Sequence, residues 1–181
     1  TGAKMIDLAG NYMEAKKTFT ATTRNGKVSL TFAIDSRLLK DVTVVAFEDL
    51  YHEDVKVAVH ADLTDKDQSV HYPGMGTSAT VNGSHYAPTA KKTKLVDRVW
   101  YQNLVPGHTY RVEGTLMDKA TNKPILINGG EVTVKKDFVP KSANGYVDME
   151  FEFNSSSLDK HTVVVFEHMY DGKVLLTSHA D

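Results

Sequence analysis

The sequence has no cysteine, and no part of it approaches the roughly 20 consecutive apolar residues that span a bilayer. Without cysteine the protein has no disulfide, no thiolate zinc site and no cysteine nucleophile. Its 21 basic and 23 acidic side chains leave a net charge of −2, which provides no electrostatic footprint for nucleic acid. We therefore expect neither nucleic acid nor a membrane as a partner.

An internal repeat organises the chain. Residues 27–62 recur as residues 146–181 at an offset of 119 residues without a gap, and 19 of the 50 aligned positions from residue 13 onward are identical. The 181 residues therefore hold about one and a half periods. This length predicts a piece of a tandem array, in which the first copy lacks its beginning and the second lacks its end.

The repeat predicts three segments along the chain. Residues 1–70 are expected to be the C-terminal part of one repeat, and residues 77–181 the N-terminal and central part of the next, without its last strand. Residues 71–76, a Pro/Gly stretch, are expected to be a linker between them. One complete repeat would run from Gly74 to Asp181 and continue with the equivalent of residues 63–70.

The pattern of apolar residues indicates β-structure throughout. Apolar and polar residues alternate, as in half-buried strands, at 27–34, 109–117, 131–139 and 146–153. A longer apolar run at 161–170 is followed by Asp171-Gly172, a hairpin-turn dipeptide. About seven short strands per repeat, separated by turn residues, are typical of an immunoglobulin fold. We predict an all-β protein made of immunoglobulin-like β-sandwich repeats.

A histidine and several aspartates cluster near the end of the first copy. His60, Asp62 and Asp65 offer nitrogen and oxygen ligands for a metal ion such as calcium. The run lacks the glycine and the terminal glutamate of an EF-hand loop. An acidic turn with solvated charges before a final strand explains the same residues, and the spacing leaves both interpretations open.

Glu48 and its repeat equivalent Glu167 each end a run of apolar residues. If that run is buried on both faces, the carboxylate is partly buried and needs a partner, although a glutamate at a strand end can also reach solvent. Thr77 shares one strand face with Met75 and Ala79, so its hydroxyl is expected to point inward. An inward threonine is most often a small core residue.

Five short motifs follow one another along the chain: Thr-Ser-Ala-Thr (77–80), Val-Asp-x-Val-x-Tyr-x-Asn-Leu-x-Pro-Gly (96–107), Gly-Thr-Leu-Met-Asp-Lys (114–119), Val-Val-x-Phe-Glu, and His-Ala-Asp-Leu-x-Asp-x-x-Gln. In these motifs essentially the whole chain resembles the Thr–Gln ester-bond domains, or VaFE repeats, of Gram-positive surface adhesins. The resemblance implies immunoglobulin-like modules stacked into a stalk that is anchored in the cell wall. Their partners would be neighbouring repeats of the same adhesin.

The resemblance also implies roles for single residues of the first copy. Gln68 matches the glutamine that accepts the cross-link, and His60 matches the family's histidine. Asp65 matches one member of the family's acidic pair. We place the other acid at Glu48, because this residue recurs in the second copy as Glu167.

In the second copy the matching residues are Thr77, Glu167 and His179. Thr77 is expected to be the nucleophile, and Thr80 is the second choice because its side chain should face the other side of the strand. The threonine hydroxyl would attack the glutamine carboxamide, and ammonia would leave. Such a module reacts once with itself, so it is not an enzyme, and the chemistry needs no metal and no other cofactor.

Neither copy holds both cross-linking residues, since Gln68 lies in the first copy and Thr77 in the second. We therefore expect the chain to be a piece of a longer array, or to exchange strands with another copy of itself, so that Gln68 of one chain meets Thr77 of the next. Strands from other chains are a third alternative.

Two other functions fit parts of the pattern. One is a ligand-binding β-sandwich in which His60 or His179 and nearby aspartates hold a metal. The other is a pilin-like module with a lysine–asparagine isopeptide bond, in which Lys16-Lys17 or Lys135-Lys136 supply the amine and Glu48 or Glu167 catalyses. Nothing in the sequence indicates a host receptor.

Overall fold

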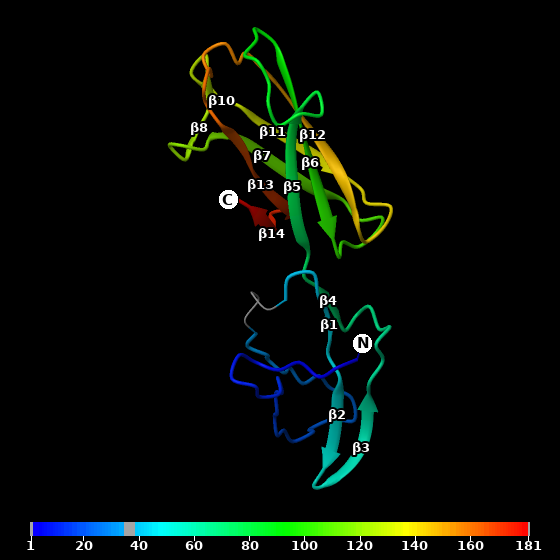
Figure 1. Ribbon diagram of the computed structural model, residues 1–181. Coiled ribbons are helices and arrows are strands. Elements are labelled where there is room, and N and C mark those ends of the chain that lie inside the picture. Colours follow the sequence, from blue (N-terminus) through cyan, green and yellow to red (C-terminus); the bar gives the residue numbers. More distant parts are fainter. Residues whose placement is uncertain (1, 35–38, 181) are drawn as a thin grey trace. The chain divides into compact units, whose positions relative to one another are not determined.

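The computed structural model describes residues 2–34 and 39–180, and these ranges contain strands, turns and extended segments but no helix. The chain divides into two compact units (Figure 1). The first comprises residues 1–40 and 45–69, and the second comprises residues 41–44 and 70–181. The prediction of an all-β protein is confirmed.

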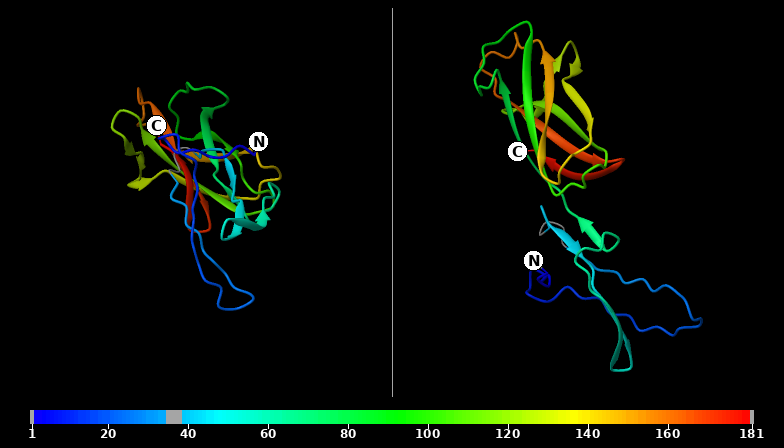
Figure 2. Two further views of the ribbon diagram at one scale, coloured as in Figure 1. Left: turned by 90° about the horizontal axis from the view of Figure 1, so that it is seen from below. Right: turned by 90° about the vertical axis from the view of Figure 1, so that its right-hand side faces the viewer.

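The second unit is an immunoglobulin-like sandwich of two antiparallel sheets (Figure 1 and Figure 2). One sheet has the strand order β12 (Gly145–Phe153), β6 (Thr93–Gln102) and β5 (Gly74–Val81). The facing sheet has the order β11 (Thr133–Phe138), β7 (Tyr110–Asp118), β13 (Val163–Asp171) and β14 (Val174–His179), with β8 (Lys123–Pro124) also paired to β7. The short strands β9 (Leu126–Ile127) and β10 (Gly130–Glu131) form a separate hairpin.

The core of this unit lies between the two sheets, because every second residue of each strand points inward. In β6, the apolar side chains of Leu95, Val99 and Tyr101 are buried, while Val96, Arg98 and Trp100 on the other face are more exposed. Full burial of one such side chain stabilises the fold by about 1.5–3 kcal/mol. The largest fully buried apolar side chains of this unit are Val99, Leu104, Val112, Leu116, Met149, Phe151 and Met169.

The first unit has a smaller set of strands. β2 (Glu48–His52) and β3 (Val55–His60) form an antiparallel hairpin. The short strands β1 (Thr43–Val45) and β4 (Ser69–His71) pair with each other, and each contains a point at which the chain passes from one unit to the other.

The internal repeat is visible in the hairpins of the two units. In β2–β3 Glu48 pairs with His60, and in β13–β14 Glu167 pairs with His179. Each hairpin has an irregularity at the same repeat position, between residues 50 and 51 in one and between residues 169 and 170 in the other. The 119-residue offset therefore conserves both the register and the local twist of this hairpin.

The prediction of a strand at residues 27–34 is wrong. This segment is extended but belongs to no sheet, whereas its repeat equivalent, residues 146–153, lies in β12. β12 is held by its ladder with β6, and the positions equivalent to β6 would precede residue 1. Because a strand needs a neighbour for its backbone hydrogen bonds, the same alternating pattern forms no strand here.

The expected linker at residues 71–76 is partly strand. His71 ends β4, and β5 begins at Gly74, so only Tyr72 and Pro73 lie between these two strands. Among residues 2–34 and 39–180, no helix is long and apolar enough to cross a membrane.

Candidate functional site

Four polar side chains from the two sheets of the second unit converge in its interior. Glu167 of β13 and His179 of β14 are direct neighbours across their ladder. Thr77 and Asp97 come from β5 and β6 of the facing sheet. Thr77 pairs with the fully buried Val99, so the two side chains share the inward face, and Asp97 is itself fully buried.

A continuous line of contacts joins these residues. The Thr77 Oγ1 lies 3.2 Å from the His179 Nδ1, and that Nδ1 lies 3.4 Å from the Glu167 Oε2. Glu167 in turn lies near Asp97 of the facing sheet, and each of these carboxyl groups shifts the pKa of the other. In the tautomer that carries its proton on Nε2, the His179 Nδ1 can accept the proton of the Thr77 hydroxyl.

Asp97 and Glu167 form a buried pair of acids that shares a proton. As two carboxylates they would bury four oxygens without a hydrogen-bond donor, and a proton held between them supplies one. Burial and the neighbouring Asp97 raise the pKa of Glu167 to about 10. Burial also raises the pKa of Asp97, while Glu167 and the nearby His179 act against that rise. The proton therefore resides on Glu167 at neutral pH, and Asp97 accepts it in a hydrogen bond.

Asp97 was not among the candidates from the sequence, although a signal was present. In β6 it occupies the inward series with Leu95, Val99 and Tyr101, where a charged residue is rare. An acid at an apolar position of an alternating strand indicates a buried partner. The partner is Glu167, 70 residues later in the sequence, and no local pattern connects the two.

Thr80 lies on the same strand as Thr77 but on its other face. It pairs with the partly exposed Val96, whereas Thr77 pairs with the buried Val99. Successive side chains of a strand alternate between its faces, so the hydroxyl of Thr80 points away from His179.

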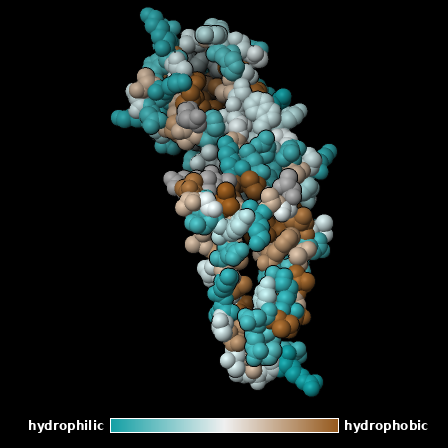
Figure 3. Space-filling view, turned by 60° about the horizontal axis from the view of Figure 1, so that its bottom comes forward, coloured by the Kyte–Doolittle hydropathy of each residue, from teal (hydrophilic) through white to brown (hydrophobic). Residues whose placement is uncertain are grey.

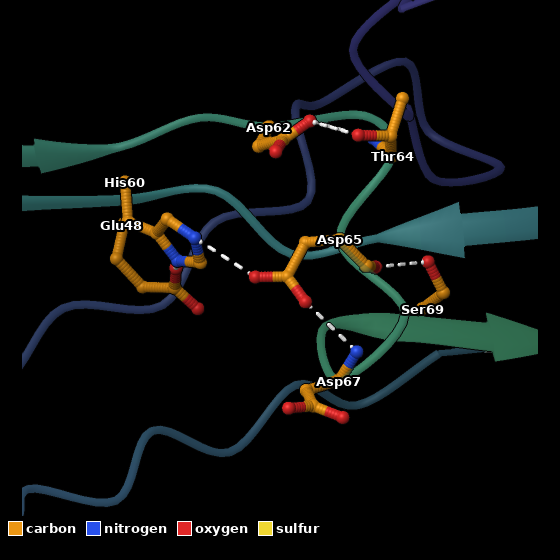
Figure 4. Close-up of polar contacts among 7 residues, drawn as sticks. All are labelled: Glu48, His60, Asp62, Thr64, Asp65, Asp67 and Ser69. Carbon is orange, nitrogen blue, oxygen red and sulfur yellow. Dashed lines mark hydrogen bonds and ion pairs between the residues drawn. The ribbon is translucent and has the colours of Figure 1, made fainter.

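The first unit holds a related but more open cluster (Figure 4). The His60 Nδ1 lies 3.4 Å from the Glu48 Oε2, the same atom pair and distance as in the second unit. The His60 Nε2 lies 2.9 Å from the Asp65 Oδ2. The Glu48 side chain is 35% exposed and that of Glu167 0%, so the acid of the first unit lacks the apolar cover of its equivalent.

Asp65 and Gln68 lie in the turn that leads into β4. The Asp65 carboxylate accepts a hydrogen bond from the Asp67 N–H at 2.8 Å, and its carbonyl accepts one from the Ser69 hydroxyl (Figure 4). The backbone carbonyl of Gln68 accepts a hydrogen bond from the Ala46 N–H at 3.1 Å, and the residue is half-buried. These bonds fix the backbone on both sides of the glutamine.

The two units thus carry different parts of one constellation. Both have the glutamate–histidine contact of the hairpin. Among the described residues, Thr77 and Asp97 lie beside this contact in the second unit. In the first unit Asp65 lies beside it, and Gln68 follows three residues later; the positions of both one repeat later would follow residue 181.

The lysines considered for an isopeptide bond lie on the surface. Lys135 pairs with Glu113 at 3.0 Å, and Lys136 donates to the Asp148 carbonyl at 2.7 Å. The described residues near the buried Glu167 are Thr77, Asp97 and His179 rather than a lysine. Among residues 2–34 and 39–180, no group of three or more histidines, aspartates or glutamates is arranged to hold a metal ion.

The raised pKa of Glu167 predicts that the second unit loses stability as the pH rises. A carboxyl group that is easier to protonate in the folded state contributes its full stabilisation below its unfolded pKa of about 4.5 and loses it toward about 10. Urea unfolding followed by fluorescence of Trp100, the single tryptophan, should give a lower free energy of unfolding at pH 9 than at pH 6. Glu167→Gln should flatten this dependence, and an equal slope in both proteins would contradict the shared proton.

Comparison with known proteins supports the assignment by another route. The sequence model of the T-Q ester bond containing domain matches residues 1–72 and again residues 73–181. Among curated proteins none matches the chain.

Two solved structures share the fold, both titled as a bacterial adhesin from Mobiluncus mulieris containing intramolecular disulfide, isopeptide and ester bond cross-links. They are 16% and 17% identical to this chain, with TM-scores of 0.51 and 0.52. The similar region covers 61% of this chain and 53% of each adhesin chain, so it spans about half the length of those proteins. With the family model matched along both units, the chain belongs to the family of T-Q ester bond containing domains.

Proposed function

We propose that the chain is a structural stalk module of a bacterial surface adhesin, stabilised by an autocatalytic Thr–Gln ester cross-link. Membership of the T-Q ester bond family supports the cross-link, and the similar Mobiluncus mulieris structures are those of an adhesin with ester bonds. This role places the protein outside the cell, anchored in the wall of a Gram-positive bacterium, with neighbouring repeats of the same adhesin as its partners.

The observation that carries the proposal is the position of the Thr77 hydroxyl, 3.2 Å from the His179 Nδ1 and beside a buried, protonated acid pair. Thr77 Oγ1 attacks the carbonyl carbon of a glutamine side chain, and His179 takes the hydroxyl proton. The C–N bond of the amide then breaks, and the proton passes to the leaving nitrogen, which departs as ammonia. The product is an ester between the threonine and the glutamine side chain.

The acid pair acts on the glutamine rather than on the threonine. The proton that this pair holds can be donated to the amide oxygen in place of the Asp97 carboxylate, and it then stabilises the negative charge that develops there. Because Asp97 keeps this proton in place at neutral pH, the donor is present before the glutamine arrives. A hydroxyl and an amide do not react in water, so most of the acceleration comes from fixed orientation, which can be equivalent to effective molarities of about 10⁵ M or more. The module turns over once and is not an enzyme.

The glutamine for Thr77 has to come from a segment like residues 63–70 of the first copy. β5 and β14, which carry Thr77 and His179, are edge strands of the two facing sheets. An edge strand has unpaired backbone groups that accept another strand. We propose that a glutamine-bearing strand of the same array, or Gln68 of another copy of the chain, adds at this edge.

The first unit exposes apolar side chains whose repeat equivalents are buried in the second unit. Val28, Leu30 and Phe32 are 42%, 38% and 40% exposed, whereas their repeat equivalents in β12 are 8%, 0% and 0% exposed. Apolar side chains at the surface appear brown in the space-filling view (Figure 3). In the second unit the equivalent face packs against the opposite sheet, which contains β7, while β6 and β5 continue the sheet of β12. We therefore propose that the first unit binds a segment with the pattern of residues 74–118, which brings a threonine to Gln68.

Mass spectrometry of a lengthened protein tests the proposal. We define the extended chain as the present sequence with a second copy of residues 63–70 added after Asp181, which supplies the second unit with a glutamine. Its intact mass should fall by about 17 Da, the mass of ammonia. Thr77→Ala should abolish the loss, because it removes the attacking oxygen.

Thr80→Ala is the matched control, since it removes a threonine of the same strand that faces away from His179. It should lose ammonia as the parent does. An unshifted mass in an extended chain whose second unit is folded would refute the proposal.

A further inference from the structure

The motif Gly-Thr-Leu-Met-Asp-Lys contains a buried glycine that the proposed reaction does not use. Gly114 lies in β7, directly opposite Glu167 across the ladder. Glu167 is in turn paired with His179, so Gly114, Glu167 and His179 form one row across three strands. On the facing sheet Met149 and Asp97 are paired in the corresponding row.

The space above Gly114 is already filled by the facing sheet. A Cβ atom on Gly114 would lie 2.9 Å from the Phe151 Cζ, 3.2 Å from the Met149 Cε and 3.3 Å from the Val165 Cγ1. All three side chains belong to the core, and Met149 and Phe151 are fully buried. No positive φ requires glycine at this position, so the need for glycine is one of space.

This geometry connects the glycine with the acid pair. Gly114 and Met149 face each other next to the place where Glu167 meets Asp97, and both contacts join the same two sheets. A side chain on β7 would have to push Met149 and Phe151 outward. Because Met149 is the ladder neighbour of Asp97, such a shift would separate the two acids and admit water.

We propose that Gly114 is a positioning residue of the cross-linking reaction: its missing side chain lets Met149 and Phe151 close over the Asp97–Glu167 pair and brings the two sheets near enough for the acids to share a proton. This inference rests on the proposed ester chemistry of the same site. Gly114 touches neither the threonine nor the glutamine, and it acts only through the packing beside the acids.

Four variants separate this role from a general loss of stability. Gly114→Ala adds the methyl group. Gly114→Ala with Phe151→Leu removes the nearest clashing atom and nearly restores the core volume, and Phe151→Leu alone is its reference. Gly130→Ala is the matched control, because its nearest non-neighbouring atom would lie at 3.8 Å and its side chain would be at the surface.

The first measurement uses the 181-residue chain and does not depend on ester formation. A ¹³C NMR titration of the side-chain carboxyl carbons measures the titration midpoints of Asp97 and Glu167 directly. The other groups that act on these two acids are His179, Thr77 and Asp148 of β12. Gly114→Ala should lower the titration midpoint of Glu167, since water then reaches the pair. The midpoint of the double variant should return toward that of the Phe151→Leu reference, and the midpoint of Gly130→Ala should equal that of the parent.

The second measurement is the rate of ammonia loss in the extended chain. Gly114→Ala should slow it roughly tenfold or more, because small misplacements of reacting groups are costly. The double variant should react within about threefold of the Phe151→Leu reference. A folded Gly114→Ala protein with the parent's midpoint and rate would overturn the proposal, as would a folded double variant that recovers neither.

If Gly114→Ala does not fold, the double variant is compared with Phe151→Leu by the titration midpoint of Glu167 and by the rate of ammonia loss. A folded double variant that recovers neither value overturns the proposal. Failure of the ester chemistry itself has a different signature. In that case the parent extended chain keeps its mass, while the titration of the 181-residue chain still reports whether Gly114 positions the acids.

Discussion

Replacing Asp97 with alanine in the extended chain should slow cross-linking by about 10²-fold or more. Without Asp97, Glu167 loses both the hydrogen-bond acceptor and the negative neighbour that raise its pKa. Glu167 then ionises more readily, and a carboxylate beside the reacting amide repels the negative charge that develops on the oxygen. The rate of ammonia loss, measured by intact mass over time, checks this prediction.

Asp148→Ala is the control for this variant. Asp148 is also an acid of the same sheet, but it pairs with Arg98 on the partly exposed outer side at 2.7 Å. Its removal should leave the rate of cross-linking within about twofold of the parent, because an exposed ion pair contributes little. Cross-linking of folded Asp97→Ala at the parent rate would show that the acid pair takes no part in the chemistry.

The second large effect concerns stability. An ester from Thr77 to the added glutamine closes a loop of roughly 110 residues, and a cross-link over a loop of this size stabilises by about 4–5 kcal/mol in the chain-entropy estimate. For a unit of about 100 residues this corresponds to a rise in melting temperature of roughly 20 °C or more. Thermal unfolding followed by Trp100 fluorescence should show this difference between the extended chain and its Thr77→Ala variant.

The Thr77→Ala variant keeps the added strand and loses only the covalent bond, so the comparison isolates the cross-link. The two proteins should differ in melting temperature, whereas the fluorescence spectra of their folded states should be similar. Equal melting temperatures, with the mass of the extended chain already reduced, would mean that the bond forms without stabilising the unit.

Much of the fold could be predicted from the sequence because its signals are local or repeated. Alternation of apolar residues predicted β7, β11 and β12 of the second unit, and the 119-residue offset predicted the matching hairpins with Glu48 and Glu167 beside their histidines. The strand expected at residues 27–34 failed for a reason outside that segment. An alternating pattern forms a strand only where a neighbour satisfies its backbone, and β12 has β6 while residues 27–34 have no such neighbour among the described residues.

The candidate site shows the same division between local and distant information. The recurrence of glutamate and histidine led to Glu167 and His179, and the alternation in β5 directed Thr77 inward. Asp97 is different, since its partner Glu167 lies on the facing sheet and only the packing of the two sheets brings them together. The role of Gly114 is equally invisible in the sequence, because it depends on the side chains that fill the space above it.

In the proposed reaction, Thr77 and a glutamine of the following segment form an ester. Protease digestion of the extended chain and fragmentation of the joined peptides locate the bond, and treatment with hydroxylamine separates an ester, which is cleaved, from an isopeptide, which is not. We predict one joined pair of peptides, connecting Thr77 to the added glutamine and released by hydroxylamine. A joined pair that contains a lysine and resists hydroxylamine, or unjoined peptides from a folded extended chain, would contradict the proposed ester bond.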